Sequence, residues 1–450
     1  MNTPTTDSDP GSITLARWLG TLVGRVSTEI IKVGTPPLVK EPEEPLLQMP
    51  KDLYLIENSV KANEARKLIL SKMDRHNQAQ VEPGVFGVMR EAFESRQHTR
   101  VNALRDHEAQ IALDVMQEIL LGIGPGDDGV HCDIVLEVTR RLVRRMMQKL
   151  ACMSCRLPRQ MVATNVVRKI AQPWAQGAFA DVYKGEYNGD DVAIKHIRAF
   201  NASTPPTEKA RKLLYRKAIL WFNVDHKNIL KFLGVCFDHE SLPGTCMVLQ
   251  WSQNGAITEY LDLLIMESSP LVLGPAYVHT INQWLYEIAL GLQYLHSHNI
   301  VHGDLRGVNV LIDKNGNVLL ADFDLAVIAD VGNSFTENHG INCTPFTAPE
   351  LFDVQDENYI VRPTRETDVY SFAMTCIELY TNAKPFPNST PAQVMAMVMK
   401  GIRPPRPPNT DRGFSDPMWN LVEACWSQKK EERPSADAVV GKMSNVIEAH

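Results

Sequence analysis

The sequence predicts an α+β protein in two parts, one rich in strands and one helical, preceded by a separate helical region. Three observations lead to this fold class. Short apolar runs rich in β-branched residues lie between residues 162 and 250, whereas the chain after Gly255 has mainly helical periodicity. Strands followed by helices are typical of an α+β fold. Before Pro158, apolar residues recur at the three- and four-residue spacing of helices.

Composition divides the 450 residues into three segments. Residues 1–54 hold a Thr-, Ser-, Asp- and Pro-rich start, an apolar pattern over 13–34 and a Pro- and Glu-rich stretch over 34–50. We expect this segment to be disordered or a linker that can hold one short helix. Residues 55–158 are expected to be helical, with two or three helices over 55–121. Residues 159–448 hold the α+β part.

The helical region ends in a predicted helical hairpin. One helix spans 107–121, a Gly-rich break follows, and a second helix spans 133–150. Its basic residues lie largely off the apolar stripe, so we expect a solvated face, with docking of an acidic partner or a membrane as the alternative. These residues are Arg140, Arg141, Arg144, Arg145 and Lys149.

Charge, hydropathy and cysteine content exclude several classes of protein. The 46 basic and 53 acidic residues give a net charge of −7, which argues against a dedicated nucleic-acid binder. The N-terminus lacks a signal-peptide pattern, and no stretch of 18 apolar residues occurs. We therefore expect a soluble, cytoplasmic protein without a membrane span. Of eight cysteines, Cys152 and Cys155 have C-x-x-C spacing without a matching second pair, which favours free thiols over zinc.

Two weak signals for nucleotide binding lie in the strand-rich part. A loop of small residues at 175–180 keeps one glycine of a phosphate-binding pattern, Gly177. Phe179 follows it two residues later in the sequence. Taken alone, this loop is better explained as a plain hairpin turn. Lys195 ends an apolar run after this loop, and its amine can neutralise phosphate oxygens.

A much stronger signal follows the helix predicted over 281–295. The run His-Gly-Asp-Leu-Arg-Gly-Val-Asn at 302–309 contains Asp304 and Asn309, and Asp322 follows a later apolar run. Asp and Asn oxygens are ligands suited to Mg²⁺, and a further Asp can accept a hydroxyl proton. With Ala-Pro-Glu at 348–350, the order and spacing indicate a site for phosphoryl transfer.

On these motifs, residues from about 160 to 447 resemble a eukaryotic protein kinase domain. The details look most like the tyrosine-kinase-like branch of Ser/Thr kinases and are similar to its expanded fungal members. The resemblance implies a bilobal fold, with a β-rich N-lobe and a helical C-lobe. It also implies that ATP and Mg²⁺ are used to phosphorylate Ser/Thr hydroxyls of protein substrates.

The resemblance assigns roles to single residues of the predicted site. Lys195 would position the α/β-phosphates, Asp304 would be the catalytic base, and Asn309 and Asp322 would hold the metal ions. Lys195, Asp304 and Asn309 are the catalytic candidates. The nucleotide would be bound by Gly177, Phe179, Val182, Ala193, Lys195, Leu249, Gln250, Ser252 and Leu311.

Two further roles concern support of the site. Asp368, in the run Asp-Val-Tyr-Ser-Phe at 368–372, would support the catalytic loop. Arg433 would pair with Glu350, and this ion pair would tie the activation segment to the C-lobe.

The chain departs from the kinase pattern at four places. Lys217 stands where the family carries a glutamate that pairs with Lys195, and two like charges repel. Glu208, half a turn out of phase on the helix, is a poor substitute. The other departures are Ala175 and Ala180 at the outer loop glycines, Asp324 after Asp322-Phe323, and Gly303 beside the catalytic Asp.

These departures leave a second hypothesis open, a catalytically impaired pseudokinase that binds nucleotide and acts as a scaffold or regulator. A third hypothesis makes the N-terminal helices the working part, through self-association or docking of a partner. Simple packing of these helices against the kinase N-lobe is the alternative to the third hypothesis.

Overall fold

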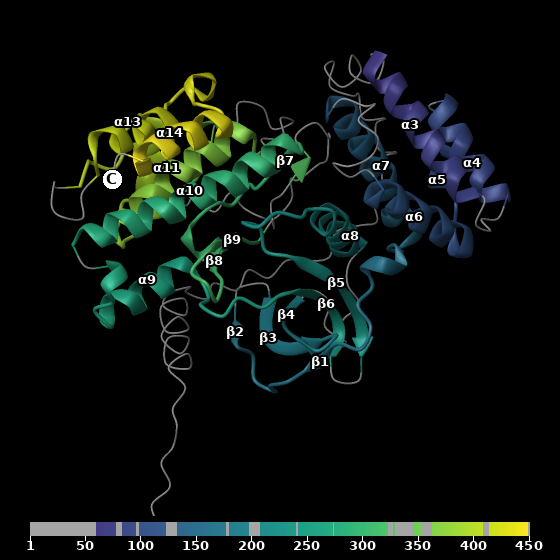
Figure 1. The fold of residues 1–450 in the computed structure, drawn as a ribbon, viewed down its shortest axis with the longest axis horizontal. Coiled ribbons are helices and arrows are strands. Elements are labelled where there is room, and N and C mark those ends of the chain that lie inside the picture. Colours follow the sequence, from purple (N-terminus) through teal and green to yellow (C-terminus); the bar gives the residue numbers. More distant parts are fainter. Residues whose placement is uncertain are drawn as a thin grey trace, which may run out of the picture.

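The computed structural model describes residues 60–77, 83–95, 99–122, 133–176, 180–197, 208–239, 242–272, 274–322, 327–328, 345–352, 362–407 and 414–448. The predicted disorder, short helix and linker of residues 1–54 lie outside the described residues. Figure 1 shows a group of N-terminal helices, a strand-rich lobe and a second, larger group of helices. We call the strand-rich lobe with its helix α8 the N-lobe, and the chain after residue 251 the C-lobe.

The N-terminal helical unit comprises five helices among the described residues. They are α3 (Val60–Asn77), α4 (Pro83–Ser95), α5 (Thr99–Asn102), α6 (Asp106–Leu121) and α7 (Asp133–Ser154). The prediction of two or three helices before residue 121 was wrong, since four are present there. The reason is local: α5 is one turn long and α3 has a weak apolar stripe, so neither shows a clear period.

The predicted hairpin of α6 and α7 is confirmed, because the two helices pack against each other. The apolar face of α6, including Leu113 and Met116, is fully buried, as are Met147 and Leu150 of α7. Full burial of such a side chain stabilises the fold by about 1.5–3 kcal/mol. One expectation for α7 was wrong: Arg144 lies 3% exposed rather than on a solvated face.

The N-lobe is built on an antiparallel sheet with the strand order β1-β3-β4-β6-β5, and β2 pairs with β3. Of the apolar run over 162–170, only two residues form a strand, because the left-handed Asn165 interrupts its extended course. The bounds are β1 (Val167–Arg168), β2 (Ala175–Gln176), β3 (Ala180–Tyr187), β4 (Asp190–Ile197), β5 (Phe232–His239) and β6 (Leu242–Gln250).

Helix α8 (Glu208–Phe222) lies between β4 and β5 in the chain and is covered on two sides. It contacts β5 of the sheet and α7 of the N-terminal helical unit. Figure 1 shows α7 on the face of the N-terminal helices that is turned toward α8. The helical unit is therefore packed onto the N-lobe within the same chain.

The C-lobe is mainly helical, around α10 and the almost fully buried α11. A capping box in which Thr364 and Thr367 bond reciprocally starts α11. The helices are α9 (Ile257–Met266), α10 (Pro275–Ser297), α11 (Arg365–Thr381), α12 (Pro391–Met399), α13 (Asp416–Cys425) and α14 (Ala436–Glu448). Short strand pairs join β7 (Ile300–Val301) to β10 (Val327–Ile328), and β8 (Val310–Ile312) to β9 (Val318–Leu320).

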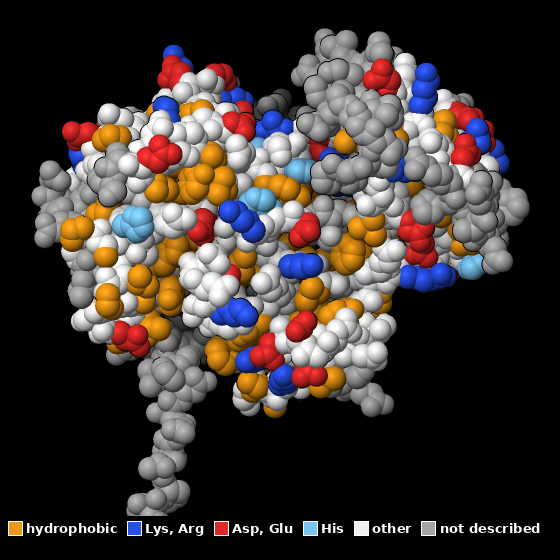
Figure 2. Space-filling model, in the orientation of Figure 1, with side chains coloured by type: hydrophobic (Ala, Val, Ile, Leu, Met, Phe, Trp, Pro, Cys, Tyr) orange, Lys and Arg blue, Asp and Glu red, His pale blue; other side chains and the backbone are white. Residues whose placement is uncertain are grey.

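The predicted α+β, bilobal architecture with a preceding helical region is confirmed. In the part of the chain that the structure describes, every helix is too short or too polar to cross a membrane. Acidic and basic side chains are interspersed on the face seen in Figure 2. The two thiols of the C-x-x-C pair, Cys152 and Cys155, form no disulfide with another described cysteine.

Candidate active site

The loop between β7 and β8 brings two of the predicted residues into direct contact. The amide nitrogen of Asn309 donates to the carboxylate of Asp304 at 2.8 Å and to its backbone carbonyl at 2.7 Å. Asn309 ends the 3₁₀ turn η4 (Gly307–Asn309) and is buried. Because this side chain cannot turn away, it fixes the orientation of the Asp304 carboxylate.

Asp368 holds the same loop from α11. Its carboxylate, 1% exposed, accepts the backbone N–H groups of His302 and Gly303, both at 2.8 Å, and lies 2.8 Å from Nε2 of His296. A buried carboxylate is costly unless hydrogen bonds compensate it, and here three do. The predicted support of the catalytic loop by Asp368 is confirmed.

Backbone conformation explains the glycine beside Asp304. Gly303 has φ 83°, in the left-handed region that side chains other than glycine enter at a cost. The departure at this position therefore removes a side chain and also relieves backbone strain. The amide of Gly303 still reaches Asp368 in this conformation.

A second carboxylate of α11, Glu378, also supports this loop. It lies ten residues after Asp368 on the helix, and the sequence reasoning missed it. Glu378 accepts the backbone N–H of Gly307 at 2.8 Å, and a Cβ at Gly307 would lie 2.7 Å from that carboxylate. Burial raises the pKa of Glu378 to about 7. The only hint in the sequence is an acidic residue within a long apolar helical run.

Lys195 of β4, in the N-lobe, contacts Asp322 of the C-lobe. Their side chains form an ion pair and are 12% and 39% exposed. Asp322 has φ 59°, a left-handed conformation that Asp tolerates better than most residues. The countercharge of Lys195 therefore comes from Asp322, while Glu208 pairs with Lys212 at the exposed start of α8.

Opposing effects act on the pKa of Asp304. Burial raises the pKa of Asp304, while the charge of Arg306, whose Nε lies 3.4 Å from the carboxylate, opposes this shift. The nearby charge of Asp322 also raises the pKa of Asp304. A carboxylate with a raised pKa is a stronger base than an ordinary aspartate.

Strand register places the predicted nucleotide-binding residues on neighbouring strands. Val182 of β3 pairs with Lys195 of β4, and Ala193 of β4 pairs with Leu249 of β6. Leu311 comes from β8 of the C-lobe. Gly177 and Phe179 lie outside the described residues, as does Asp324.

The segment after β6 is anchored to both lobes. The backbone N–H of Gln250 donates to the carbonyl of Lys231, at the start of β5, at 2.9 Å. The hydroxyl of Ser252 donates to the carbonyl of Ile312, at the end of β8, at 2.6 Å. This connection therefore lies between the sheet of the N-lobe and Leu311.

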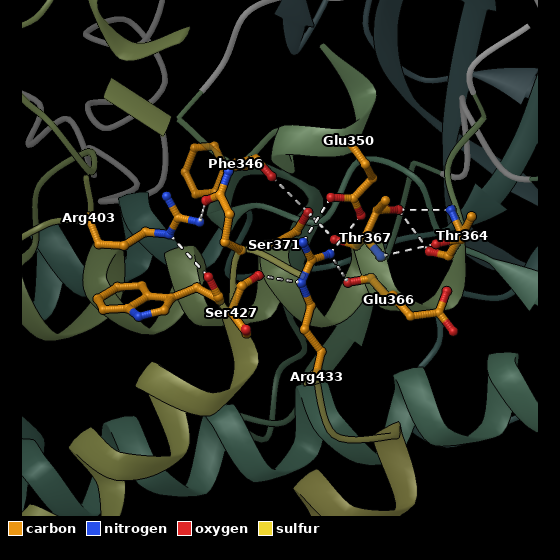
Figure 3. Close-up of polar contacts among 11 residues, drawn as sticks. Phe346, Glu350, Thr364, Glu366, Thr367, Ser371, Arg403, Ser427 and Arg433 are labelled. Atoms are coloured by element: carbon orange, nitrogen blue, oxygen red, sulfur yellow. Dashed lines mark hydrogen bonds and ion pairs between the residues drawn. The ribbon is translucent and has the colours of Figure 1, made fainter. Parts of the chain in front are cut away.

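Arg433 and Glu350 form the predicted ion pair (Figure 3). Two guanidinium nitrogens of Arg433 lie 2.7 and 2.8 Å from the two oxygens of Glu350. Arg433 also donates to the backbone carbonyls of Glu366 and Ser427, both at 2.9 Å. The Ser371 hydroxyl of α11 donates to the carbonyl of Phe346 at 2.9 Å, so residues 345–352 are held both by Arg433 and by α11.

The donor set suits Mg²⁺. Asn309 uses its amide nitrogen on Asp304, which leaves its amide oxygen to offer to a cation, and Asp322 adds a carboxylate. Among the described residues, no cluster of three His, Cys, Asp or Glu side chains forms a closed metal site. Mg²⁺ is usually bound by one or two side-chain oxygens together with phosphate oxygens and water.

Comparison with known proteins gives consistent matches over the same part of the chain. The model of the protein tyrosine and serine/threonine kinase family matches residues 169–443. Serine/threonine-protein kinase STY46 of Arabidopsis thaliana is 27% identical over 279 residues, 62% of this chain and 44% of that protein. Serine/threonine/tyrosine-protein kinase HT1 of the same plant is 27% identical over 280 residues, 62% of this chain and 66% of that protein.

A viral relative shows the same extent of similarity. The putative serine/threonine-protein kinase/receptor R831 of Acanthamoeba polyphaga mimivirus is 26% identical over 282 residues, 62% of this chain and 16% of that protein. The chain spans less than two thirds of the length of each of these three relatives.

Proposed function

Because this chain belongs to the protein tyrosine and serine/threonine kinase family, we propose that it transfers the γ-phosphate of ATP to Ser/Thr hydroxyls of protein substrates. Members of this family generally use ATP and Mg²⁺. One observation carries the proposal: two contacts, between Lys195 and Asp322 and between Asn309 and Asp304, gather the four predicted groups. The backbone N–H of Ala321, next to Asp322, donates to the carbonyl of Asn309 at 2.9 Å, so the two pairs are neighbours.

In this proposal Asp304 accepts the proton of the attacking hydroxyl. Its contact with Asn309 holds one carboxylate oxygen and leaves the other to face the acceptor. The raised pKa of Asp304 makes the carboxylate a better proton acceptor, and it also means that protonation removes the base at a higher pH than for an ordinary aspartate. We therefore expect the acidic limb of the kcat/KM profile to lie above the ordinary pKa of aspartate.

Lys195, Asn309 and Asp322 bind and orient the nucleotide in the same proposal. Mg·ATP, when bound, supplies the phosphoryl group and neutralises charge on it. The Lys195 amine would contact phosphate oxygens, and the oxygens of Asn309 and Asp322 would hold the cation. Catalysis of this kind consists mostly of positioning and electrostatics.

The adenine would lie between the two lobes. Support comes from strand pairing, which places Ala193 beside Leu249, and from the Ser252 bond that brings β8 and Leu311 against the connecting segment. Gln250 ends β6, Ser252 follows it, and Val182 pairs with Lys195 on the neighbouring strands β3 and β4. Gly177 and Phe179 remain predictions for the phosphate loop.

The direct test is transfer of labelled γ-phosphate from Mg·ATP to a generic protein acceptor by the full chain. Asp304→Asn should reduce transfer at least about 100-fold, as expected for loss of a general base. Asp262→Asn is the matched control, because Asp262 is an exposed carboxylate outside the site that bonds Asn382. Labelled phosphoserine and phosphothreonine are expected after acid hydrolysis.

Label found only in phosphotyrosine would refute the Ser/Thr assignment. Absence of transfer by the folded wild-type chain would refute the kinase proposal itself and support the pseudokinase alternative.

Three further predictions are kept as proposals. We propose a cytoplasmic location, domain boundaries at residues 54/55 and 158/159, and docking or self-association through the N-terminal helices. The faces of α6 and α7 that meet α8 are already covered within the chain. Sedimentation of the full chain across a concentration series tests self-association, and a mass that stays monomeric would contradict it.

A further inference from the structure

Helix α8 lacks the residue by which protein kinases fix it. In this family an ion pair joins the lysine of β4 to a glutamate of this helix, and catalysis depends on it. Here Lys217 stands at the expected position, Lys195 pairs with Asp322 of the C-lobe, and Glu208 of α8 pairs with Lys212. Some other contact must therefore set the position of α8.

The end of α8 is bonded to α6 through a reciprocal pair of amides. The amide nitrogen of Gln117 donates to Asn223 at 3.0 Å, and the amide nitrogen of Asn223 donates back to Gln117 at 3.3 Å. Asn223 also donates to the carbonyl of Ile219 in the last turn of α8. Gln117 is 0% exposed, so it cannot exchange Asn223 for water without the helices moving apart.

Further bonds join α7 and the residue after it to the middle of α8. Gln148 donates to the backbone carbonyl of Arg216 at 3.2 Å, and the Cys152 thiol lies 3.6 Å from the carbonyl of Lys212. The hydroxyl of Tyr215 donates to the carbonyl of Cys155 at 3.1 Å. Together with the Gln117 pair, these bonds form a seam along α8 from Lys212 to its end.

The same helix α7 also reaches the C-lobe. Its Arg144 is almost fully buried, and the charges of Arg144 and Glu137 both act on the pKa of His298, directly after α10. Burial lowers the pKa of Arg144, and Glu137 and Tyr294 oppose that shift. Helix α7 therefore packs on α8 of the N-lobe, and its charged side chains lie near the end of α10 of the C-lobe.

A short series of contacts leads from α8 to the predicted nucleotide pocket. Trp221 of α8 donates to the carbonyl of Leu230 at 2.8 Å and stacks on Phe232 of β5. Phe232 pairs with Leu249 of β6, which pairs in turn with Ala193 of β4. A displacement of the end of α8 would therefore move the strands that carry the proposed adenine contacts.

We propose that the N-terminal helical unit is a brace within the chain that positions α8 and the nucleotide-binding strands in place of the absent lysine–glutamate pair. Gln117 and Gln148 are positioning residues in this account. The consequence for ATP rests on the proposed kinase function, whereas the restraint on α8 itself does not.

The test uses the full chain with Gln117→Leu and, separately, Gln148→Leu. Gln110→Leu is the matched control, because Gln110 lies on the same helix but bonds Asp114 and the carbonyl of Leu157. Trypsin reports the opening of α8 directly, since this helix carries Lys and Arg along its length. Thermal unfolding of each variant shows that it is folded.

We expect each seam variant to be cleaved within α8 at least about 5-fold faster than wild type, because a buried amide left unpaired favours the open state. The KM for ATP should rise by a similar factor, with kcat changed less than about 2-fold. Gln110→Leu should leave both quantities within about 2-fold of wild type.

Unchanged cleavage and KM in folded Gln117→Leu and Gln148→Leu would overturn the proposal that the helical unit positions α8. Equal effects in Gln110→Leu would overturn it as well. A wild-type chain that neither transfers phosphate nor binds ATP would refute the proposed function instead. The tryptic rates would then still decide whether the helical unit holds α8.

Discussion

The two halves of the candidate active site are held in different ways. We call the loop at 302–309 of the C-lobe the lower half, and the nucleotide side of the N-lobe, with Lys195 and α8, the upper half. In the lower half, backbone N–H groups of the catalytic loop bond Asp368 and Glu378, two buried carboxylates of α11. In the upper half, Lys195 meets Asp322 through partly exposed side chains, and α8 is held from outside the N-lobe by the helical unit. The loop is thus fixed by the core of its own lobe, whereas the nucleotide side depends on a separate segment.

The largest effect is expected from Asp368→Ala, which breaks the support of the lower half. The change leaves two backbone N–H groups and His296 without their buried acceptor. We expect the free energy of unfolding to fall by about 3–5 kcal/mol and phosphate transfer to be lost. Urea unfolding measures the first quantity, and a loss below about 1 kcal/mol would show that the loop has other support.

A smaller, pH-dependent effect is expected from Glu378→Gln. Because the folded-state pKa is raised to about 7, the folded chain keeps a proton that the unfolded chain releases near its ordinary pKa. The associated stability is present at low pH and is lost as the pH rises through about 7. In the variant, the decline in unfolding free energy between about pH 5 and pH 8 should shrink by about 2–3 kcal/mol.

Part of that decline should remain in Glu378→Gln, because burial also raises the pKa of Glu259 to about 7. Unfolding curves across this pH range measure the difference. An identical decline in wild type and variant would mean that Glu378 is ionised in the folded protein.

The next smaller effect is expected from Arg433→Lys, which keeps the positive charge but loses the paired N–H donors of the guanidinium group. One amine cannot replace the paired bonds to Glu350 and the two bonds to backbone carbonyls. We expect a loss of about 1–3 kcal/mol in unfolding free energy. Arg90→Lys, at an exposed ion pair with Asp74, is the control and should change it far less than Arg433→Lys does. Equal losses would contradict the account.

The smallest effect on stability is expected from Lys195→Met in the upper half. Its pair with Asp322 is partly exposed, so the unfolding free energy should change by less than about 1 kcal/mol. Phosphate transfer should nevertheless fall at least about 100-fold, since the amine is proposed to contact the phosphates. Parallel unfolding and transfer measurements separate the two quantities, and undiminished transfer would remove Lys195 from the proposed site.

The sequence predicted the site better where its residues lie in short motifs. Asp304 and Asn309 are five residues apart, so the motif itself fixes their contact. Glu378 was missed because only tertiary packing places it under Gly307. Arg144 was expected on a solvated face, since a helical pattern shows one apolar stripe and cannot reveal a second packed side.

Local conformation explains the remaining differences in the fold. The run over 162–170 has β-type composition, but the left-handed Asn165 interrupts it, so that only Val167 and Arg168 form a strand. Helix α5 is too short to show periodicity. The amide pair of Gln117 and Asn223 joins residues 106 positions apart, and neither residue type signals such a contact.

Native-state hydrogen exchange of the full chain tests most directly whether the two halves are held separately. The amides of His302, Gly303 and Gly307 report the lower half, and those of α8 report the upper half. We predict that Gln117→Leu accelerates exchange in α8 by at least about 5-fold and leaves the three loop amides unchanged. Equal acceleration of both sets, or of neither, would contradict the account.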